Sequence, residues 1–351
     1  MRAFDILANR EGGGGLGLAV SGGSDSTALL VLAADWARGN GARIEVATVD
    51  HGLRPEAAEE AEAVAKLCER LGLRHATLRW KRERTGPAAQ AEARRARHAL
   101  LADWAHQASA PVIALGHTRD DRVETFLMRA RQGSGWRGLA GPLPSGPSPV
   151  WPEGHGLRLI RPLLAFAREE LRGELNGRSV GWMEDPSNEA ERFERVRVRA
   201  LMRRMDAAAA AQALRVMDAL AAMRAAVATE ARGALAVSNP EGDAARVRVE
   251  LLLHLGREVR LRLLEALLMA AGGAELAPRA EALKRLCERV EHGGLGLSGG
   301  VTLGGAWIRR ADGDIVVAQA PARRGEAVKA GPVWDRAAGL LGDPMLAALA
   351  V

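Results

Sequence analysis

Ser21-Gly22-Gly23-Ser24-Asp25-Ser26 is the stretch that decides how this chain folds. An apolar run at residues 16–20 precedes it and an apolar-periodic segment at residues 27–36 follows it, which predicts a turn between a buried strand and a helix. The two glycines let a ligand approach the backbone, and the serine hydroxyls and first-turn amides can donate to phosphate oxygens at the positive end of the helix dipole. We therefore expect a nucleotide-binding loop made of Ser21, Gly22, Gly23, Ser24, Asp25 and Ser26.

Asp25 indicates how the phosphates are held. No Gly-Lys-Ser/Thr follows, so the loop is not of the Walker type. A carboxylate beside phosphates is repelled unless Mg²⁺ lies between them, which predicts that Asp25 binds a metal ion carried by the nucleotide. The alternative is a turn that only caps a helix, with Ser24 or Asp25 as the N-cap.

Composition limits the class of protein. The 351 residues suffice for about two domains, and the 48% of hydrophobic residues can supply their cores. A net charge of +6 indicates an anionic partner, nucleic acid before membrane. Cys68 and Cys287 have neither disulfide nor zinc spacing, and no apolar leader or membrane span is found, so we expect a soluble, cytoplasmic protein that does not bind membranes.

Strands and helices alternate along the first half of the chain. Strands are predicted at 43–49, 75–80, 111–115 and 157–162, with helices at 56–71, 88–108 and from 166 onward. This order predicts an α/β fold with a parallel sheet and helices on both faces. Because ligands bind at the carboxyl ends of such strands, the polar clusters at 21–26, 50–54 and 117–124 should converge on one crevice.

The third cluster carries the most chemistry. Asp121 and Glu124 are three residues apart in a predicted helix, so both carboxylates should lie on one side of its first turn. We expect the inner face of that helix to consist of Val123, Phe126, Leu127 and Ala130. Capping of the helix is the alternative role for either carboxylate taken alone.

Three parts are predicted along the chain. Residues 1–204 should form the nucleotide-binding and catalytic domain, and 205–320 a mainly helical domain that ends in a β-hairpin near 301–319. Residues 321–351 show weak periodicity and are expected to be a partly disordered tail. Four arginines at helical spacing form either a basic edge or a solvated face: Arg192, Arg195, Arg199 and Arg203.

Several motifs together resemble one family, the tRNA(Ile)-lysidine synthetases of the PP-loop ATP pyrophosphatase superfamily. They are Ser21 to Ser26, Val49 to Arg54, Arg97 before His98, His117 to Thr125, Gly133-Ser134-Gly135 with Gly138-Leu139, Arg161 to Leu164, and Glu184 to Asn188 with Phe193 and Arg195. The resemblance covers roughly the first 200 residues, and Arg260 to Gly305 is more loosely similar to the tRNA-contacting C-terminal region of the family, which implies that the domain at 205–320 contacts tRNA. Gln132 and Val196 depart from the family pattern, which usually has Arg and Asn there.

The resemblance implies a reaction in two steps. ATP, with Mg²⁺, adenylates the C2 oxygen of the wobble cytidine in a tRNA(Ile) with a CAU anticodon, and free L-lysine then displaces AMP to leave lysidine. Asp25 would then be catalytic at the phosphates and the metal, Asp121 and Glu124 would bind the lysine and be catalytic, and Arg97 and Arg195 would contact the base, its adduct or tRNA. The alternatives are a PP-loop tRNA thiolase, which needs sulfur-handling cysteines, and a non-catalytic RNA-binding module on the same fold.

Overall fold

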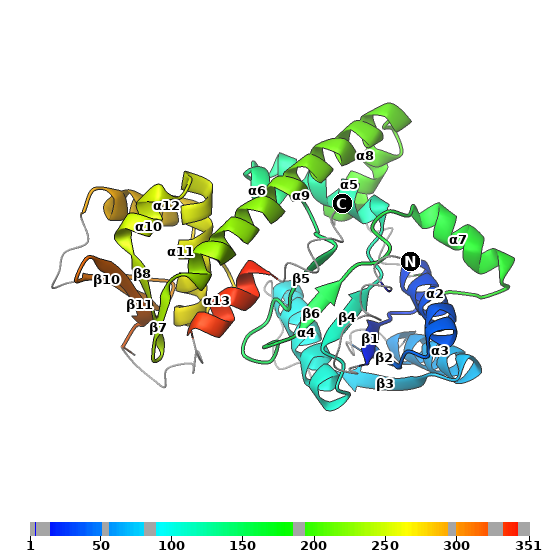
Figure 1. Ribbon diagram of the computed structural model, residues 1–351. Coiled ribbons are helices and arrows are strands. Elements are labelled where there is room, and N and C mark those ends of the chain that lie inside the picture. Colours follow the sequence, from blue (N-terminus) through cyan, green and yellow to red (C-terminus); the bar gives the residue numbers. More distant parts are fainter. Residues whose placement is uncertain are drawn as a thin grey trace. The chain divides into compact units, whose positions relative to one another are not determined.

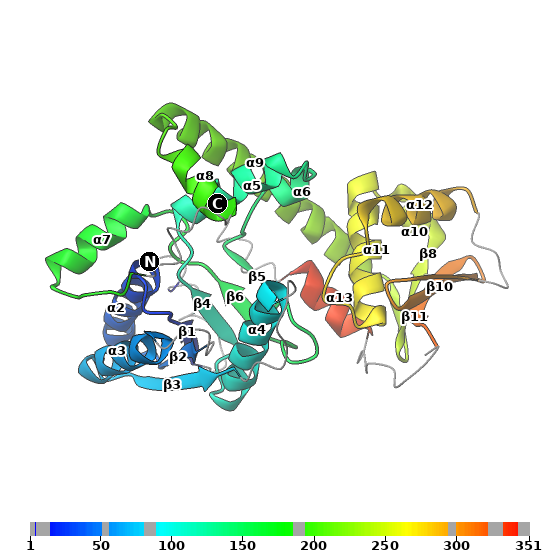
Figure 2. The same ribbon diagram turned by 180° about the vertical axis from the view of Figure 1, so that it is seen from behind.

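The structure is a computed structural model that describes residue 4 and residues 15–50, 56–80, 89–184, 194–293, 300–321 and 333–342. Packing divides the described chain into two compact units. The first holds the described residues of Met1–Ser148 and Gly156–Ala222, and the second those of Pro149–His155 and Met223–Ala348. Figures 1 and 2 show the two units from opposite sides.

A six-stranded sheet in the order β3-β2-β1-β4-β6-β5 forms the centre of the first unit. All neighbouring pairs are parallel except β5 with β6. The strands are β1 (Leu16–Ala19), β2 (Ile44–Asp50), β3 (Arg74–Arg79), β4 (Val112–Leu115), β5 (Ser145–Pro147) and β6 (Arg158–Ile160). The predicted parallel α/β fold is confirmed, and β5 is a strand that the sequence pattern does not predict.

Helices cover both faces of this sheet (Figures 1 and 2). Alternation in β1 separates the faces: Leu16 and Leu18 join the core beneath α2 and α3, whereas a Cβ at Gly17 would meet the ring of Trp104 in α4 at 3.1 Å. The helices of this unit are α2 (Ser24–Asn40), α3 (Glu56–Leu71), α4 (Ala89–Gln107), α5 (Arg119–Arg131), α6 (Trp136–Leu139), α7 (Arg168–Gly177), α8 (Glu194–Met202) and the first part of α9 (Ala207–Ala236).

The chain reverses its direction of travel across the sheet between β1 and β4. From β1 it moves outward through β2 to β3, and α4 then returns it to β4 on the other side of β1. In open α/β sheets the crevice at such a reversal, at the carboxyl ends of the strands, is where ligands bind. The segments after β1 and β4 are the two polar clusters at 21–26 and 117–124, which this topology brings together.

The second unit is built around a five-stranded antiparallel sheet in the order β7-β8-β11-β10-β9. The predicted hairpin corresponds to β10 and β11, and three further strands extend it. The elements of this unit, besides the second part of α9, are β7 (Asn239–Glu241), β8 (Ala244–Arg248), α10 (Val249–His254), α11 (Arg257–Gly272), α12 (Ala280–Glu291), β9 (Val301–Leu303), β10 (Ala306–Ala311), β11 (Asp314–Gln319) and α13 (Val333–Leu341).

Helix α11 is the centre of the second core. Nearly all of its side chains are buried, and it packs on β10 and β11 and on helices α12 and α13. Helix α13 lies within the predicted tail, and Val333, Ala337 and Leu341 enter the same core. Residues 322–332 and 343–351 of that tail lie outside the described residues.

Candidate active site

The loop between β1 and α2 is shaped by its own side chains. Gly22 has a φ of +88°, a conformation that favours glycine. The Ser26 hydroxyl accepts from the Ser21 amide at 3.1 Å and donates to the Gly23 carbonyl at 3.0 Å, and Thr27 Oγ1 donates to the Gly22 carbonyl at 3.2 Å. The Ser26 side chain therefore holds the two ends of the loop together.

The N-terminus of α2 has no side-chain cap. Gly23 is the N-cap, in an extended conformation and without a capping hydrogen bond from a side chain, so neither Ser24 nor Asp25 takes the alternative role as N-cap. The N-cap residue thus offers no capping oxygen to the first amides of α2, which can donate to an anion. Ser24 Oγ instead donates to Asp25 Oδ1 at 3.2 Å.

Gly116 brings the end of β4 against this loop. A Cβ at position 116 would lie 2.9 Å from Ser26 Cα and 3.0 Å from the carbonyl oxygen of Asp25. These are backbone atoms that cannot rotate away. The absence of a side chain at Gly116 is what lets the segments after β1 and β4 touch.

Helix α5 begins at that junction with a capping box. Thr118, the N-cap, accepts from the Asp121 amide through its hydroxyl, and Asp121 Oδ2 accepts from the Thr118 amide at 2.8 Å. Asp121 therefore takes the alternative capping role, but only through its Oδ2 atom. Its other oxygen, Oδ1, lies on the side of Arg168.

The buried side of α5 is more polar than its sequence predicts. Asp121, Val123 and Glu124 are buried, whereas Ala130 is exposed and Phe126 and Leu127 are only half-buried. The predicted apolar inner face is therefore wrong apart from Val123. The physical reason is that arginines from two other helices cover the carboxylates and satisfy them.

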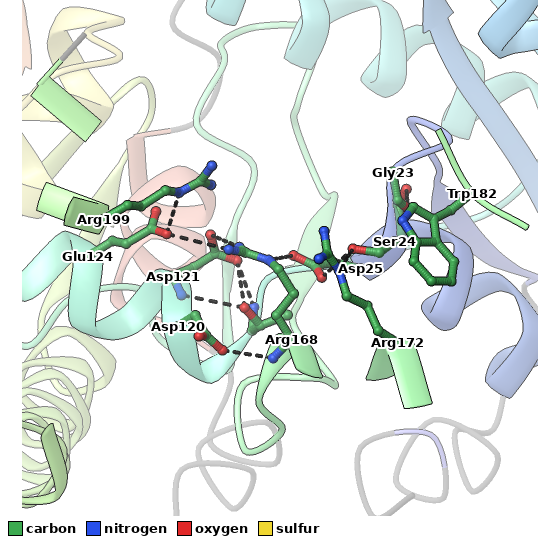
Figure 3. A network of polar contacts seen from close by, with 12 residues as sticks. Gly23, Ser24, Asp25, Asp120, Asp121, Glu124, Arg168, Arg172, Trp182 and Arg199 are labelled. Atoms are coloured by element: carbon green, nitrogen blue, oxygen red, sulfur yellow. Dashed lines mark hydrogen bonds and ion pairs between the residues drawn. The ribbon is translucent and has the colours of Figure 1, made fainter. Parts of the chain in front are cut away.

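Arg168, the first residue of α7, lies among three carboxylates (Figure 3). Its Nε donates to Asp25 Oδ2 at 2.9 Å, and Nη2 lies 3.4 Å from Asp121 Oδ1 and Nη1 3.7 Å from Glu124 Oε1. From α8, Arg199 Nε donates to the same Glu124 oxygen at 2.7 Å. The predicted phosphate and lysine residues are thus joined into one network.

Burial sets the electrostatics of this network. Desolvation raises the pKa of Asp25 above its usual value, although Arg168 opposes the rise. Burial alone would lower the pKa of Arg168, but Asp25, Asp121 and Glu124 outweigh it and raise that pKa. The Arg168 guanidinium therefore stays charged, as the common partner of the three carboxylates.

The signature of the PP-loop domain family matches residues 2–205. A tRNA(Ile)-lysidine synthase from Hyphomonas neptunium is 44% identical over 301 residues, 84% of this chain and 78% of the relative. Another from Bradyrhizobium sp. is 39% identical over 333 residues, 89% of this chain and 91% of the relative. The chain belongs to the tRNA(Ile)-lysidine synthase family.

A solved structure supports the fold independently. The U34-tRNA thiolase NcsA from Methanococcus maripaludis, described with its [4Fe-4S] cluster, aligns with a TM-score of 0.50 at 16% identity, over 62% of this chain and 76% of that one. At this identity the likeness concerns the fold alone. The family membership rests on the lysidine synthases.

The structure describes only some residues of the other family motifs. Asp50 ends β2, whereas residues 51–55 lie outside the described residues. Arg195 lies in the first turn of α8, and nothing is described of its side chain. Glu184 accepts from Arg172 and from the Trp182 indole at 2.8 and 3.0 Å, and the Met183 amide donates to the Gly22 carbonyl. The segment before residue 185 thus lies against the loop.

Arg97 lies on α4 in a cluster of cations. Burial, and then the nearby Arg97, Arg94 and Arg161, lower the pKa of His98 to about 4, so this imidazole is neutral at physiological pH. Burial and Arg94 also lower the pKa of Arg161 to about 10. A bound anion would stabilise the charged form of such a buried guanidinium.

The carboxylates suit a metal ion that arrives with a nucleotide. Among the described residues, no group of three or more His, Cys, Asp or Glu side chains could hold a metal by itself. Asp25 can offer one partly exposed carboxylate beside the uncapped amides, and Mg²⁺ commonly takes one or two carboxylates together with substrate phosphates. The residues therefore fit a nucleotide-borne ion.

Two observations bear on the wider surroundings of the site. In the part of the chain that the structure describes, no helix has both the length and the apolarity to cross a membrane. Cys68 and Cys287 are buried free thiols, and burial raises their pKa values to about 12 and about 11. Neither thiol is in the thiolate form that reacts.

Proposed function

We propose that the chain forms lysidine on tRNA(Ile) in an ATP-dependent ligation. The observation that supports this best is the meeting, at the carboxyl ends of β1 and β4, of an uncapped helix N-terminus with a buried pair of carboxylates. The first suits the phosphates of ATP, and the second suits the cationic amines of lysine. A nucleotide site joined to a cation site is what this ligation requires.

Two steps describe the reaction. The C2 oxygen of the wobble cytidine in a CAU anticodon attacks the α-phosphorus of ATP, and pyrophosphate leaves. The ε-amine of free lysine then attacks C2, the C–O bond to AMP breaks, and the amine loses its extra protons. Because a free lysine amine has a pKa near 10.4, the site must first bind a cation and then promote its deprotonation.

Each set of residues has a role in this scheme. The amides and hydroxyls of Ser21 to Ser26 hold the phosphates, and Asp25 holds Mg²⁺, which when bound would neutralise charge on the leaving pyrophosphate. Asp121 and Glu124 bind the lysine amines. Arg97, within its cation cluster, and Arg195 bind phosphate or the adenylated base.

Incorporation of labelled lysine tests this proposal. The purified protein, ATP, Mg²⁺ and a tRNA(Ile) transcript with a CAU anticodon should yield lysine-labelled tRNA, and the same transcript with U34 should not. The Asp25→Asn variant serves as the inactive control. Absence of labelling with the CAU transcript would contradict the proposal.

Two rival activities give different outcomes in the same assay. A PP-loop thiolase would add sulfur to tRNA, but the only two cysteines of this chain are buried with raised thiol pKa values. An RNA-binding module would bind tRNA without releasing pyrophosphate. We place the reaction in the cytoplasm, where the two free thiols would stay reduced.

A further inference from the structure

Arg168 connects the two halves of the site, and no motif of the sequence pointed to it. Its guanidinium forms ion pairs with Asp25, Asp121 and Glu124 together. Its side chain is 22% exposed, against 18% for Asp25, 8% for Asp121 and 1% for Glu124, so this charge cluster is largely shielded from water. Interactions in such a setting are stronger than on a surface.

The three contacts of Arg168 are unequal. The one to Asp25, at 2.9 Å, is a well-formed charge-assisted hydrogen bond. Those to Asp121 and Glu124, at 3.4 and 3.7 Å, are longer, and Glu124 has its own close partner in Arg199. Asp25 therefore contributes most to holding the guanidinium in place (Figure 3).

The backbone at Arg168 is held by hydrogen bonds that do not involve its guanidinium. Its amide donates to Asp120 Oδ2 at 2.8 Å, and the Arg119 amide donates to the Phe166 carbonyl at 2.9 Å, which ties the start of α7 to the start of α5. One turn along α7, Arg172 Nε reaches Ser24 Oγ at 3.4 Å. A guanidinium on this helix can therefore reach the loop residues as well as the α5 carboxylates.

We propose that Arg168 is a positioning residue that occupies the lysine carboxylates until ATP binds, so that the nucleotide must bind before lysine does. This rests on the proposed function. Binding of the nucleotide and its metal ion engages Asp25, the closest partner of Arg168, and the triphosphate offers the guanidinium new charged acceptors. The guanidinium then leaves Asp121 Oδ1 and Glu124 Oε1, so that a cationic amine can contact Asp121 Oδ1 and share Glu124 with Arg199. A lysine ammonium and Arg168 carry the same charge and compete for the same oxygens.

Lysine binding to the full-length protein tests the proposal without turnover. Equilibrium dialysis with labelled L-lysine is performed without nucleotide and with Mg²⁺ and α,β-methylene-ATP, which cannot release pyrophosphate. We expect the wild type to bind lysine about ten- to a hundred-fold more tightly with the analogue, the scale of one charge-assisted hydrogen bond. Reciprocity requires lysine to tighten analogue binding by the same factor.

Arg168→Ala is expected to bind lysine without the analogue about as tightly as the wild type does with it, and to lose the dependence on nucleotide. Arg178→Ala is the matched control, because Arg178 caps the other end of α7 and pairs with Asp35 and Glu174 on the surface. It should behave as the wild type. Arg168→Gln, which keeps most of the aliphatic stem, serves if the alanine variant is unstable.

Two results would overturn this inference: a wild-type lysine affinity that does not change with the analogue, or an Arg168→Ala variant that keeps the wild-type dependence on it. Failure of the proposed function gives a different result. In that case the wild type would not transfer lysine to tRNA at all, whatever the binding data.

Discussion

At the scale of single residues, Asp25 combines a functional position with a cost in stability. Its pKa is raised by burial, so the folded protein holds this proton more tightly than the unfolded chain does. Ionised Asp25 therefore lowers the free energy of unfolding above the raised pKa, and this cost disappears as the pH falls below its ordinary value of 3.8. A half-buried carboxylate kept at such a cost is typical of a functional site.

The variant Asp25→Asn should separate activity from stability. We expect tRNA-dependent pyrophosphate release to fall by about two to three orders of magnitude, the scale for loss of one preorganised charge. At pH 7 the melting temperature should not fall below that of the wild type, because the desolvation cost is removed, and any difference should shrink toward pH 4. Calorimetry across pH and a pyrophosphate assay measure both. Near-wild-type pyrophosphate release would show that Asp25 has no role at the phosphates.

Asp121 and Glu124 have different structural roles: Asp121 caps α5, and Glu124 pairs with Arg199. In both Asp121→Asn and Glu124→Gln we expect the KM for lysine to rise about ten- to a hundred-fold while pyrophosphate release continues. Stability should fall by about 1–3 kcal/mol for Glu124→Gln, which leaves Arg199 without its close carboxylate, and by less than about 1 kcal/mol for Asp121→Asn, whose oxygen can still cap α5. Lysine titrations and denaturant unfolding test the pair. Loss of adenylation with an unchanged lysine KM would instead assign these carboxylates to the nucleotide.

The residues that sequence reasoning found are those fixed by local chain geometry. Ser21 to Ser26 and the pair Asp121 and Glu124 each follow a strand, and strand ends of a parallel sheet meet at one edge. Arg168 and Arg199 lie far along the chain from their partners, and which carboxylate a long side chain reaches depends on tertiary packing. Arg199 shows this directly, because its spacing placed it in a basic stripe whereas it turns inward to Glu124.

At the scale of elements, periodicity predicted most strands and helices of the first unit, though not β5 or α6, and it did not predict which strands lie next to each other. The position of β4 next to β1 follows from the crossover through α4, which no single segment reveals. Strands β7 and β8 were missed because they are short and carry charged residues: NPE and AARVR. The polar buried side of α5 was missed because hydrophobic periodicity assumes that buried positions are apolar.

Gly116 tests the contact between β4 and the loop. In Gly116→Ala the new methyl group would meet backbone atoms of Asp25 and Ser26 at about 3 Å, so we expect a stability loss of about 1–3 kcal/mol and a weaker affinity for ATP. Gly173→Ala, inside α7 with no atom within 4 Å of the added carbon, is the control and should gain about 0.5–1 kcal/mol. Denaturant unfolding and nucleotide titration measure these effects. Wild-type behaviour of Gly116→Ala would mean that the loop tolerates displacement.

At the scale of the whole molecule, the units found by packing differ from the predicted functional parts. Composition changes after Met205, where an alanine-rich helix begins, but the first half of α9 belongs to the first unit: Met217 is fully buried, and Asp218 pairs with Arg122 of α5. Composition indicates where a helix starts and not what it packs on. The division at 204–205 therefore stays a prediction about function.

The net charge of +6 leads to a last prediction, on how tRNA binding depends on salt. Each arginine that contacts a phosphate displaces counterions, so its loss should make the slope of log affinity against log salt shallower by about 0.7–0.9. Arg203 is exposed just after α8, whereas Arg199, one turn earlier, is bonded to Glu124. We expect Arg203→Ala to reduce the slope by about that amount, and Arg199→Ala to leave the slope unchanged while impairing lysine transfer.

The variant Arg38→Ala controls for loss of surface charge, because Arg38 is exposed and pairs with Asp35 on α2. Filter binding of tRNA(Ile) from 50 to 300 mM salt, on the order of the physiological range, measures the slopes. An equal reduction for Arg199 and Arg203 would mean that both face tRNA, and no reduction for Arg203 would make it an ordinary solvated residue.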